Sequence, residues 1–257
     1  MRLLSAFLVG LLCLLPFRPA TAQALVAAAS DLQFALNALA EAFRDEGGHE
    51  LRLVFGSSGN LSRQIEKGAP FELFLSADES YVERLVEAGL TRDEGVIYAQ
   101  GHLALLLPPS SPLELDASLA DLKEEAEAGR ITRFAIANPE HAPYGRAAQQ
   151  ALEAVSAWKA VQPALVLGEN VSQAAQFAVS GAAQGGLVAY SLVAVPTFEG
   201  RGQHVIIPPE GYDPLRQKMV LTRQAGPVAE AFYDYLRSSE AGEIFGRYGF
   251  ALPEEAP

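Results

Sequence analysis

Short apolar runs alternate with helical patterns along nearly the whole chain, and this alternation limits the possible folds more than any other feature. Residues 25–29 form an apolar run, after which Leu32, Leu36, Leu39 and Phe43 recur at helical spacing. Further strand-like runs follow at 51–55, 71–75, 102–107, 133–137, 164–167, 186–190, 204–207 and 218–222. Expected helices lie at 61–67, 145–155, from 171, 227–238 and 241–248. Such alternation predicts mostly parallel sheets with helices on both faces.

Two stretches look like exchange points between separate lobes of this α/β fold. They lie near residues 98–101 and 195–201, where the alternation of strands and helices is interrupted. We therefore predict that residues 101–195 form a second lobe as one continuous insert. Residues 23–100 and 196–257 would then form a discontinuous first lobe.

The first 22 residues have the pattern of a secretory signal peptide. Arg2 is followed by an apolar run over 3–17, and Ala20-Thr21-Ala22 matches a small-x-small cleavage signal. We predict cleavage after Ala22, with an uncleaved N-terminal anchor as the alternative. Cys13, the single cysteine, lies in this segment, so the mature chain would use neither disulfides nor thiol chemistry. Export without disulfides predicts a periplasmic protein.

The acidic balance of the chain restricts its partners. The formal net charge is −12, and removal of Arg2 and Arg18 with the signal peptide makes it −14. Such a surface repels nucleic acid backbones, so we expect no nucleic acid partner. It also repels small anions at long range, so an anionic ligand would have to be held by local dipoles.

Three strand-to-helix turns carry small polar residues where ligands bind in open α/β sheets, at the carboxyl ends of strands. The first contains Ser30, the second spans 56–60 and the third spans 138–145. Helix starts offer unpaired N–H groups and a favourable dipole to anions. Ser30 has an alternative as a simple helix cap, and the second turn as an ordinary polar loop.

Several segments together resemble the periplasmic molybdate-binding proteins of ABC transporters, the ModA family. The resemblance covers essentially the whole mature chain. It rests on residues 27–30, 55–65, 68–78, 138–145, 231–236 and 243–250. It implies a type II periplasmic binding protein fold, in which two lobes, each with a mixed, mostly parallel sheet flanked by helices, close on a ligand. It also implies a monomer that is not an enzyme, needs no cofactor, and delivers molybdate or tungstate to a membrane permease.

The same resemblance implies a set of ligand-binding residues. Ser30 and Ser58 would donate hydroxyl and backbone N–H groups to the oxyanion, while Tyr144 and Val171 would donate backbone N–H groups. Tyr190 would add its hydroxyl, although one residue is inserted between Val171 and Tyr190 relative to the family pattern. The alternative for Tyr190 is a strand tyrosine that covers the core. Molybdenum would be bound only as the oxyanion, with no side chain as a direct metal ligand.

The remaining ionisable residues leave two other functions open. We expect the Asp31 side chain to point away from the ligand and His141 to be an exposed loop residue. The other histidines, His49, His102 and His204, lack metal-ligand spacing. One alternative is a carrier for another anion, such as sulfate, an organic acid or a phosphonate. The other is a serine hydrolase using Ser58 with His141 as base, although no G-x-S-x-G motif occurs.

Overall fold

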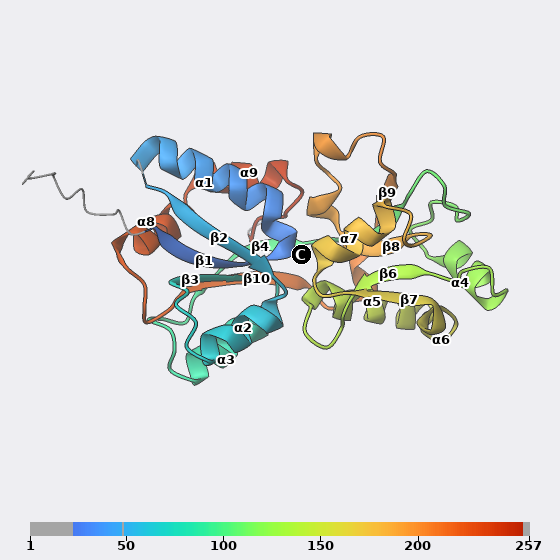
Figure 1. The fold of residues 1–257 in the computed structure, drawn as a ribbon, viewed down its shortest axis with the longest axis horizontal. Helices are drawn as coiled ribbons and strands as arrows, with labels where there is room; N and C mark the ends of the chain where they lie inside the picture. Colours follow the sequence, from blue (N-terminus) through green and yellow to red (C-terminus); the bar gives the residue numbers. More distant parts are fainter. Residues whose placement is uncertain (1–22, 48, 254–257) are drawn as a thin grey trace, which may run out of the picture.

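The computed structural model describes residues 23–47 and 49–253, and these form two α/β lobes that lie side by side along the long axis (Figure 1). Each lobe is built on its own five-stranded sheet, which confirms the predicted fold class. The expected signal peptide, residues 1–22, lies outside the described residues. No helix in the described part of the chain is long and apolar enough to cross a membrane.

The first lobe has the strand order β2-β1-β3-β10-β4. Strand β1 pairs in parallel with β2 and β3, whereas β10 runs antiparallel to β3 and β4. Its strands are β1 (Ala24–Ala29), β2 (Leu51–Gly56), β3 (Leu73–Ser76), β4 (Val96–Gly101) and β10 (Leu215–Leu221). Its helices are η1 (Ser30–Leu32), α1 (Gln33–Gly47), α2 (Ser58–Glu66), α3 (Glu79–Glu87), α8 (Pro227–Tyr235) and α9 (Ser239–Arg247).

The second lobe has the strand order β7-β6-β8-β5-β9. Strand β6 is parallel to β7 and β8, and β5 is antiparallel to β8 and β9. Its strands are β5 (Leu103–Leu107), β6 (Phe134–Ala137), β7 (Leu165–Gly168), β8 (Gly186–Ala189) and β9 (Gln203–Ile206). Its helices are α4 (Ala120–Glu127), α5 (Pro143–Ala154), α6 (Trp158–Val161), η2 (Gln162–Ala164), α7 (Val171–Val179), η3 (Tyr190–Leu192) and η4 (Pro196–Phe198), and η5 (Pro209–Gly211) follows β9.

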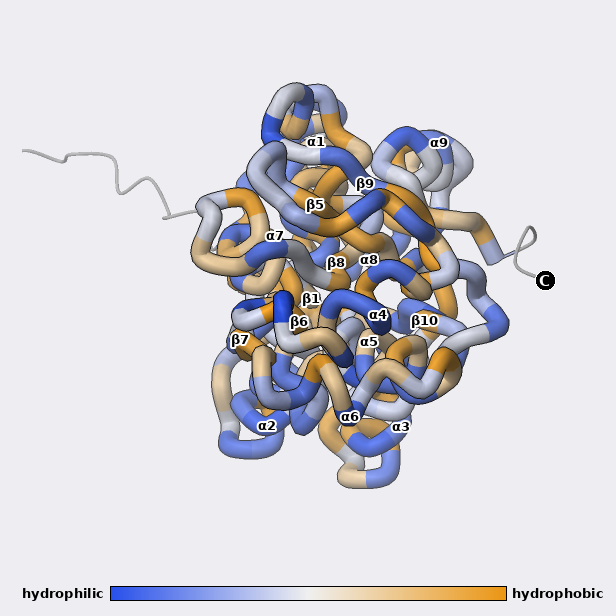
Figure 2. Tube along the Cα trace, turned by 90° about the vertical axis from the view of Figure 1, so that its right-hand side faces the viewer, coloured by the Kyte–Doolittle hydropathy of each residue, from blue (hydrophilic) through white to orange (hydrophobic). Residues whose placement is uncertain are grey.

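Alternating side chains of the strands give each lobe its core. In β1, Val26 and Ala28 pack with α1, α8 and α9, whereas Ala27 faces the opposite side and packs with α2 and α3. Figure 1 shows these two helix layers on opposite faces of the first sheet. In Figure 2, which faces the second lobe, apolar residues gather on the inner strands and hydrophilic residues on the outer segments. The last residues of β1 and β2, Ala29 and Gly56, lie at the junction of the lobes.

The chain returns to the first lobe later than the predicted boundary at residue 196. Strand β9 pairs with β5 of the second lobe, and only β10 rejoins the first sheet. Residues 195–201, interpreted as an exchange point between the lobes, instead form a loop whose Phe198 is buried in the core of the second lobe. The described second lobe thus extends through Ile206. The other crossing lies at His102, between β4 and β5.

Candidate functional site

A small cavity lies where the two lobes meet. The first lobe contributes the ends of β1 and β2 and the starts of η1 and α2. The second lobe contributes the starts of α5 and α7. The lining residues are Ala29, Ser30, Asp31, Gly56, Ser57, Ser58, Ala77, Ala142, Pro143, Tyr144 and Val171. The structure therefore brings four of the five predicted site residues, Ser30, Ser58, Tyr144 and Val171, to one place.

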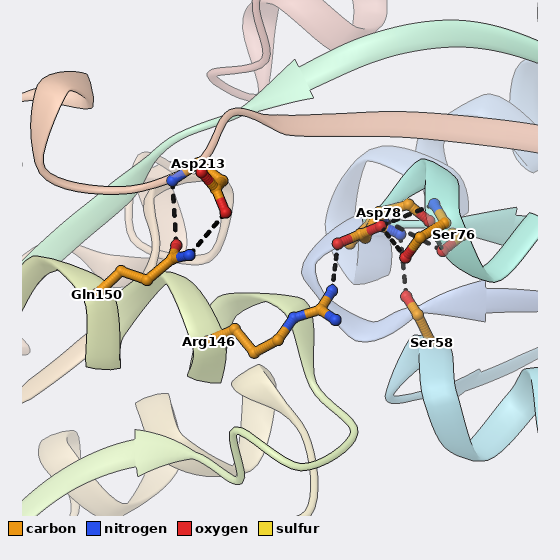
Figure 3. Close-up of polar contacts among 8 residues, drawn as sticks. Ser58, Ser76, Asp78, Arg146, Gln150 and Asp213 are labelled. Carbon is orange, nitrogen blue, oxygen red and sulfur yellow. Dashed lines mark hydrogen bonds and ion pairs between the residues drawn. The ribbon is translucent and has the colours of Figure 1, made fainter.

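Ser58 is the first residue of α2 and is completely buried. Its Oγ accepts a hydrogen bond of 3.0 Å from the backbone N–H of Ala77, which follows β3. Figure 3 shows Ser58 beside the Ser76–Asp78 turn. A serine hydroxyl has one hydrogen to donate. With a backbone N–H already bound at its oxygen, Ser58 keeps that hydrogen for a ligand in the cavity.

Ser30 links the two lobes rather than capping its own helix. Ala29 occupies the cap position before η1 and makes no side-chain cap. Ser30 Oγ accepts a hydrogen bond of 3.3 Å from the backbone N–H of Ser172, in the first turn of α7. The hydroxyl of Ser172 in turn donates to the backbone oxygen of Ser30 at 2.9 Å. Like Ser58, Ser30 therefore keeps its own hydroxyl hydrogen available.

Tyr144 and Val171 reach the cavity from the first turns of α5 and α7. Pro143 is the first residue of α5, a position where its missing N–H costs no helical hydrogen bond. Asn170 caps α7 by accepting from the backbone N–H of Gln173 at 3.0 Å. Backbone N–H groups in a first helical turn have no partner within the helix. Both helices thus present donors and the positive end of their dipoles to the cavity.

Among the described residues that line the cavity, none carries a positive charge. Hydroxyl groups, backbone N–H groups and helix dipoles are the available attractive elements, and they suit a small anion. No described group of three or more His, Cys, Asp or Glu residues could hold a metal ion. The arrangement can therefore bind an anion through neutral donors, and it offers no cluster for direct metal ligation.

Asp31 is the acidic residue in this lining, and its side chain is completely buried. Its Oδ2 accepts a hydrogen bond from the side-chain amide of Gln217 on β10, so the carboxyl is engaged with its own lobe. Burial raises the pKa of Asp31 from 3.8 to about 6, and the hydrogen bond from Gln217 together with the nearby Tyr144 hydroxyl partly opposes this rise.

Tyr190 does not reach the cavity, in contrast to the prediction. Strand β8 ends at Ala189, and the chain turns into η3 with Tyr190 as its first residue. The Tyr190 ring lies 5.7 Å from the ring of His204, measured between centroids, and packs against Gly249. The position of the ring agrees with the alternative interpretation of the sequence, in which Tyr190 covers the core.

His141 is buried, at 7 % exposure, although the sequence predicted an exposed loop residue. Its Nδ1 is 2.9 Å from Oγ of Ser57, and its backbone oxygen accepts from the N–H of Gly59 at 3.0 Å. His141 belongs to the second lobe and both partners to the first, so its burial follows from contact between lobes. Sequence reasoning paired His141 with Ser58, but the structure pairs it with the neighbouring Ser57.

A cross-lobe ion pair borders the cavity. Arg146 of α5 reaches across to the carboxylate of Asp78, the cap of α3 (Figure 3). The guanidinium carbon of Arg146 also lies 5.4 Å from the centre of the Tyr81 ring, which gives a cation–π contact. Further along α5, Gln150 and Asp213 exchange two hydrogen bonds (Figure 3). The ion pair holds α5 against the first lobe, and the Gln150–Asp213 bonds hold it against the segment that precedes β10.

Two α/β lobes that enclose a small cavity lined by hydrogen-bond donors define a solute-binding protein. The model of the bacterial extracellular solute-binding protein family matches residues 24–251. The molybdate-binding protein ModA of Rhodobacter capsulatus is 38 % identical over 81 % of this chain and 80 % of its own. ModA of Azotobacter vinelandii is 35 % identical over 90 % of each chain.

Solved structures show the same architecture. The periplasmic molybdate-binding protein of Azotobacter vinelandii superposes with a TM-score of 0.81 at 30 % identity, over 90 % of this chain and 100 % of that one. The sulfate-binding protein SubI of Mycobacterium tuberculosis reaches 0.73 at 16 % identity, over 90 % of this chain and 87 % of its own, and shares the fold. The chain belongs to the bacterial extracellular solute-binding proteins and, within them, to the ModA family, with its type II periplasmic binding protein fold.

Proposed function

We propose that this protein captures molybdate or tungstate in the cavity between its lobes and delivers it to the permease of an ABC importer. The relatives at 38 % and 35 % identity are named for molybdate binding. We further propose that it acts in the periplasm as a monomer, and that it needs no cofactor besides the transported oxyanion.

One observation carries the proposal: the hydroxyl groups of Ser30 and Ser58 both already accept a backbone N–H. The hydrogen of each hydroxyl therefore remains available for a ligand. The first-turn N–H groups of α5 and α7 are available as well. A site made of donors favours a fully deprotonated oxyanion, because a protonated oxyanion also needs an acceptor. This argues against phosphate, and cavity size would separate molybdate from the smaller sulfate because hydrogen-bond lengths vary little.

Neutral donors are sufficient for tight binding. A hydrogen bond to a charged group contributes about 1.5–3 kcal/mol net. About six such bonds would give roughly 10 kcal/mol or more, whereas association costs about 4 kcal/mol or more. The difference supports micromolar or tighter affinity. Neither lysine nor arginine is required at the ligand.

Binding would favour the closed arrangement of the lobes. Cross-lobe contacts such as Ser172 to Ser30 and Gly59 to His141 border the cavity. An oxyanion that contacts both sides adds attraction in this arrangement alone, so it shifts the population toward closure. The permease would then recognise the closed form.

The Ser57–His141 contact leads us to consider a serine hydrolase as a second function. Glu169 lies 3.8 Å from Nε2 of His141, but its side chain is 72 % exposed and therefore well solvated. A catalytic acid is normally buried and orients the histidine. A fluorophosphonate probe tests this function directly. We expect no labelling, and covalent labelling of Ser57 or Ser58 would contradict a role limited to binding.

Calorimetry of the mature protein with a panel of anions tests the proposed function. We expect one molybdate or tungstate to bind per chain, with much weaker heats from sulfate, phosphate, organic acids and phosphonates. Preferential binding of any of these other anions would identify that anion as the ligand and contradict the proposal of molybdate or tungstate. The absence of binding heat with saturating molybdate and tungstate would contradict the proposed function.

A further inference from the structure

Two residues that line the cavity from opposite lobes each carry a buried polar atom without a partner in the described part of the chain. These atoms are Oδ1 of Asp31 and the hydroxyl oxygen of Tyr144, and neither has a hydrogen-bond partner within the described residues. The Tyr144 hydroxyl is near enough to the Asp31 carboxyl to lower its pKa. Buried polar groups are costly unless they are paired. This pair therefore needs a physical account beyond the backbone donor role of Tyr144.

Both lobes cover Asp31. The first lobe contributes Gln217 on β10, which itself accepts from the Tyr98 hydroxyl of β4 at 2.7 Å. The second lobe contributes Tyr144 on α5 and Ser191 on η3, whose hydroxyl donates to the backbone oxygen of Asp31 at 2.8 Å. Within residues 23–47 and 49–253, the titratable groups that act on Asp31 are thus the two tyrosines, and no cationic side chain does so.

The second lobe controls how much water reaches this carboxyl. Separation of the lobes would withdraw Tyr144 and Ser191 and expose Asp31, which would return its pKa toward the ordinary 3.8. Closure buries the group and raises the pKa to about 6. A doubly negative ligand in the same cavity would raise this pKa further, because like charges disfavour ionisation.

The Tyr144 side chain also fixes the start of α5. Its hydroxyl packs against Gly101, the last residue of β4, where the chain crosses between the lobes. The backbone N–H of Tyr144 is one of the donors proposed for the oxyanion. Anchoring the Tyr144 hydroxyl at Asp31 and Gly101 therefore determines where that N–H points.

We propose that Asp31 and Tyr144 form a cross-lobe positioning pair that holds the start of α5 over the bound oxyanion, and that Asp31 takes up a proton when the lobes close. The proposal rests on the proposed function, since it requires an anionic ligand. A protonated Asp31 donates to the Tyr144 oxygen, and an ionised Asp31 accepts from the Tyr144 hydroxyl. One hydrogen bond can join the pair in either state, but the protonated state removes a negative charge next to the ligand.

The direction of the pH effect follows from the raised pKa. Protonation favours the closed, ligand-bound form, and this advantage is complete below the ordinary pKa of 3.8 and lost as the pH rises through the closed-form value of about 6. Affinity for molybdate should therefore fall at least about fourfold between about pH 5.5 and pH 8. Proton uptake on binding should be largest near about pH 5, midway between the two pKa values, and should approach zero well above pH 6.

Calorimetry in buffers of different ionisation enthalpy measures this uptake. The native protein should take up a fraction of a proton per molybdate at about pH 6. Protonation of the ligand itself is first subtracted from both measurements. Asp31→Asn should then show neither the proton uptake nor the pH-dependent affinity of the native protein. Asp45→Asn, an exposed control on α1, should retain both. Tight binding without proton uptake, or unchanged uptake in Asp31→Asn, would overturn the proposal and leave the proposed function standing. Absence of molybdate and tungstate binding would overturn both.

Tyr144→Phe tests the pair without altering the charge, and it serves if Asp31→Asn does not fold. It keeps the backbone donor and removes the hydroxyl that stabilises the carboxylate. Proton uptake should move to higher pH, and ligand dissociation should be about fivefold faster. Tyr235→Phe is a matched control, because Tyr235 has a buried hydroxyl without a partner in the core of the first lobe. Equal effects of the two variants would contradict a specific role for Tyr144.

Discussion

The backbone N–H of Gly59 in the first lobe donates to the backbone oxygen of His141 in the second, at 3.0 Å. This hydrogen bond joins α2 directly to the loop before α5 and lies beside the cavity. A side-chain carbon at Gly59 would lie 2.7 Å from that oxygen and 3.0 Å from the Tyr81 ring. The close approach of the lobes therefore depends on a position without a side chain.

We expect Gly59→Ala to weaken molybdate binding by at least about tenfold, or 1.4 kcal/mol, because the added methyl group holds the lobes apart. The ligand-free protein should not lose stability, since alanine favours a helix by up to about 1 kcal/mol over glycine. Calorimetry and thermal unfolding measure the two effects. Gly246→Ala in α9 is the control, because nothing lies within 4 Å of its added carbon. Native affinity in Gly59→Ala would contradict the closing contact.

Ser58→Ala should weaken molybdate binding by about 1–3 kcal/mol, because it removes one hydroxyl donor to a charged ligand. It should also lower the free energy of unfolding by about 1 kcal/mol, since the buried N–H of Ala77 loses its acceptor. Titration calorimetry and chemical denaturation separate the two losses. Ser62→Ala lies in the same helix but outside the cavity lining. It should change stability without changing affinity, and equal affinity losses in both variants would exclude a ligand contact by Ser58.

Tyr190→Phe should leave molybdate affinity within about twofold of the native value. The Tyr190 ring packs on His204 and Gly249, outside the cavity lining. Binding isotherms of the variant and the native protein provide the comparison. A tenfold or greater loss would restore the tyrosine hydroxyl as a ligand donor and contradict the placement of η3.

The ion pair between Arg146 and Asp78 should contribute only about 0–1 kcal/mol to closure, because both side chains are partly exposed. A double-mutant cycle with Arg146→Met and Asp78→Ser isolates this coupling. Serine is chosen because Asp78 also caps α3, accepting from the N–H of Ser80 at 2.8 Å. The coupling energy in molybdate affinity should disappear at high salt. A large coupling that persists in salt would indicate a buried, structural pair instead.

The resemblance to the ModA family implied a common site for Ser30, Ser58, Tyr144 and Val171, and local rules explain why they meet. Each residue follows a strand and begins or precedes a helix, and the carboxyl ends of parallel strands meet at one edge of a sheet. The family resemblance then selected these residues from several polar candidates. Their role as ligand donors remains a prediction, whereas their common location is observed.

The features that sequence reasoning missed depend on contacts between distant segments. His141 is buried only because the lobes meet, and β9 belongs to the second lobe only because it pairs with β5. The turn at η3 sets the direction of the Tyr190 ring, and spacing along the chain does not encode it. Helix α4 was not predicted because it buries only Leu122 and Ala126, which is too little to give an apolar stripe.

A crystal structure of the mature protein with molybdate tests the central claim most directly. The account predicts one oxyanion between the lobes, contacted by the hydroxyl groups of Ser30 and Ser58 and the backbone N–H groups of Tyr144 and Val171. No lysine or arginine side chain should lie within hydrogen-bond distance of its oxygen atoms. An oxyanion bound outside this cavity, or held inside it by a cationic side chain, would contradict the account.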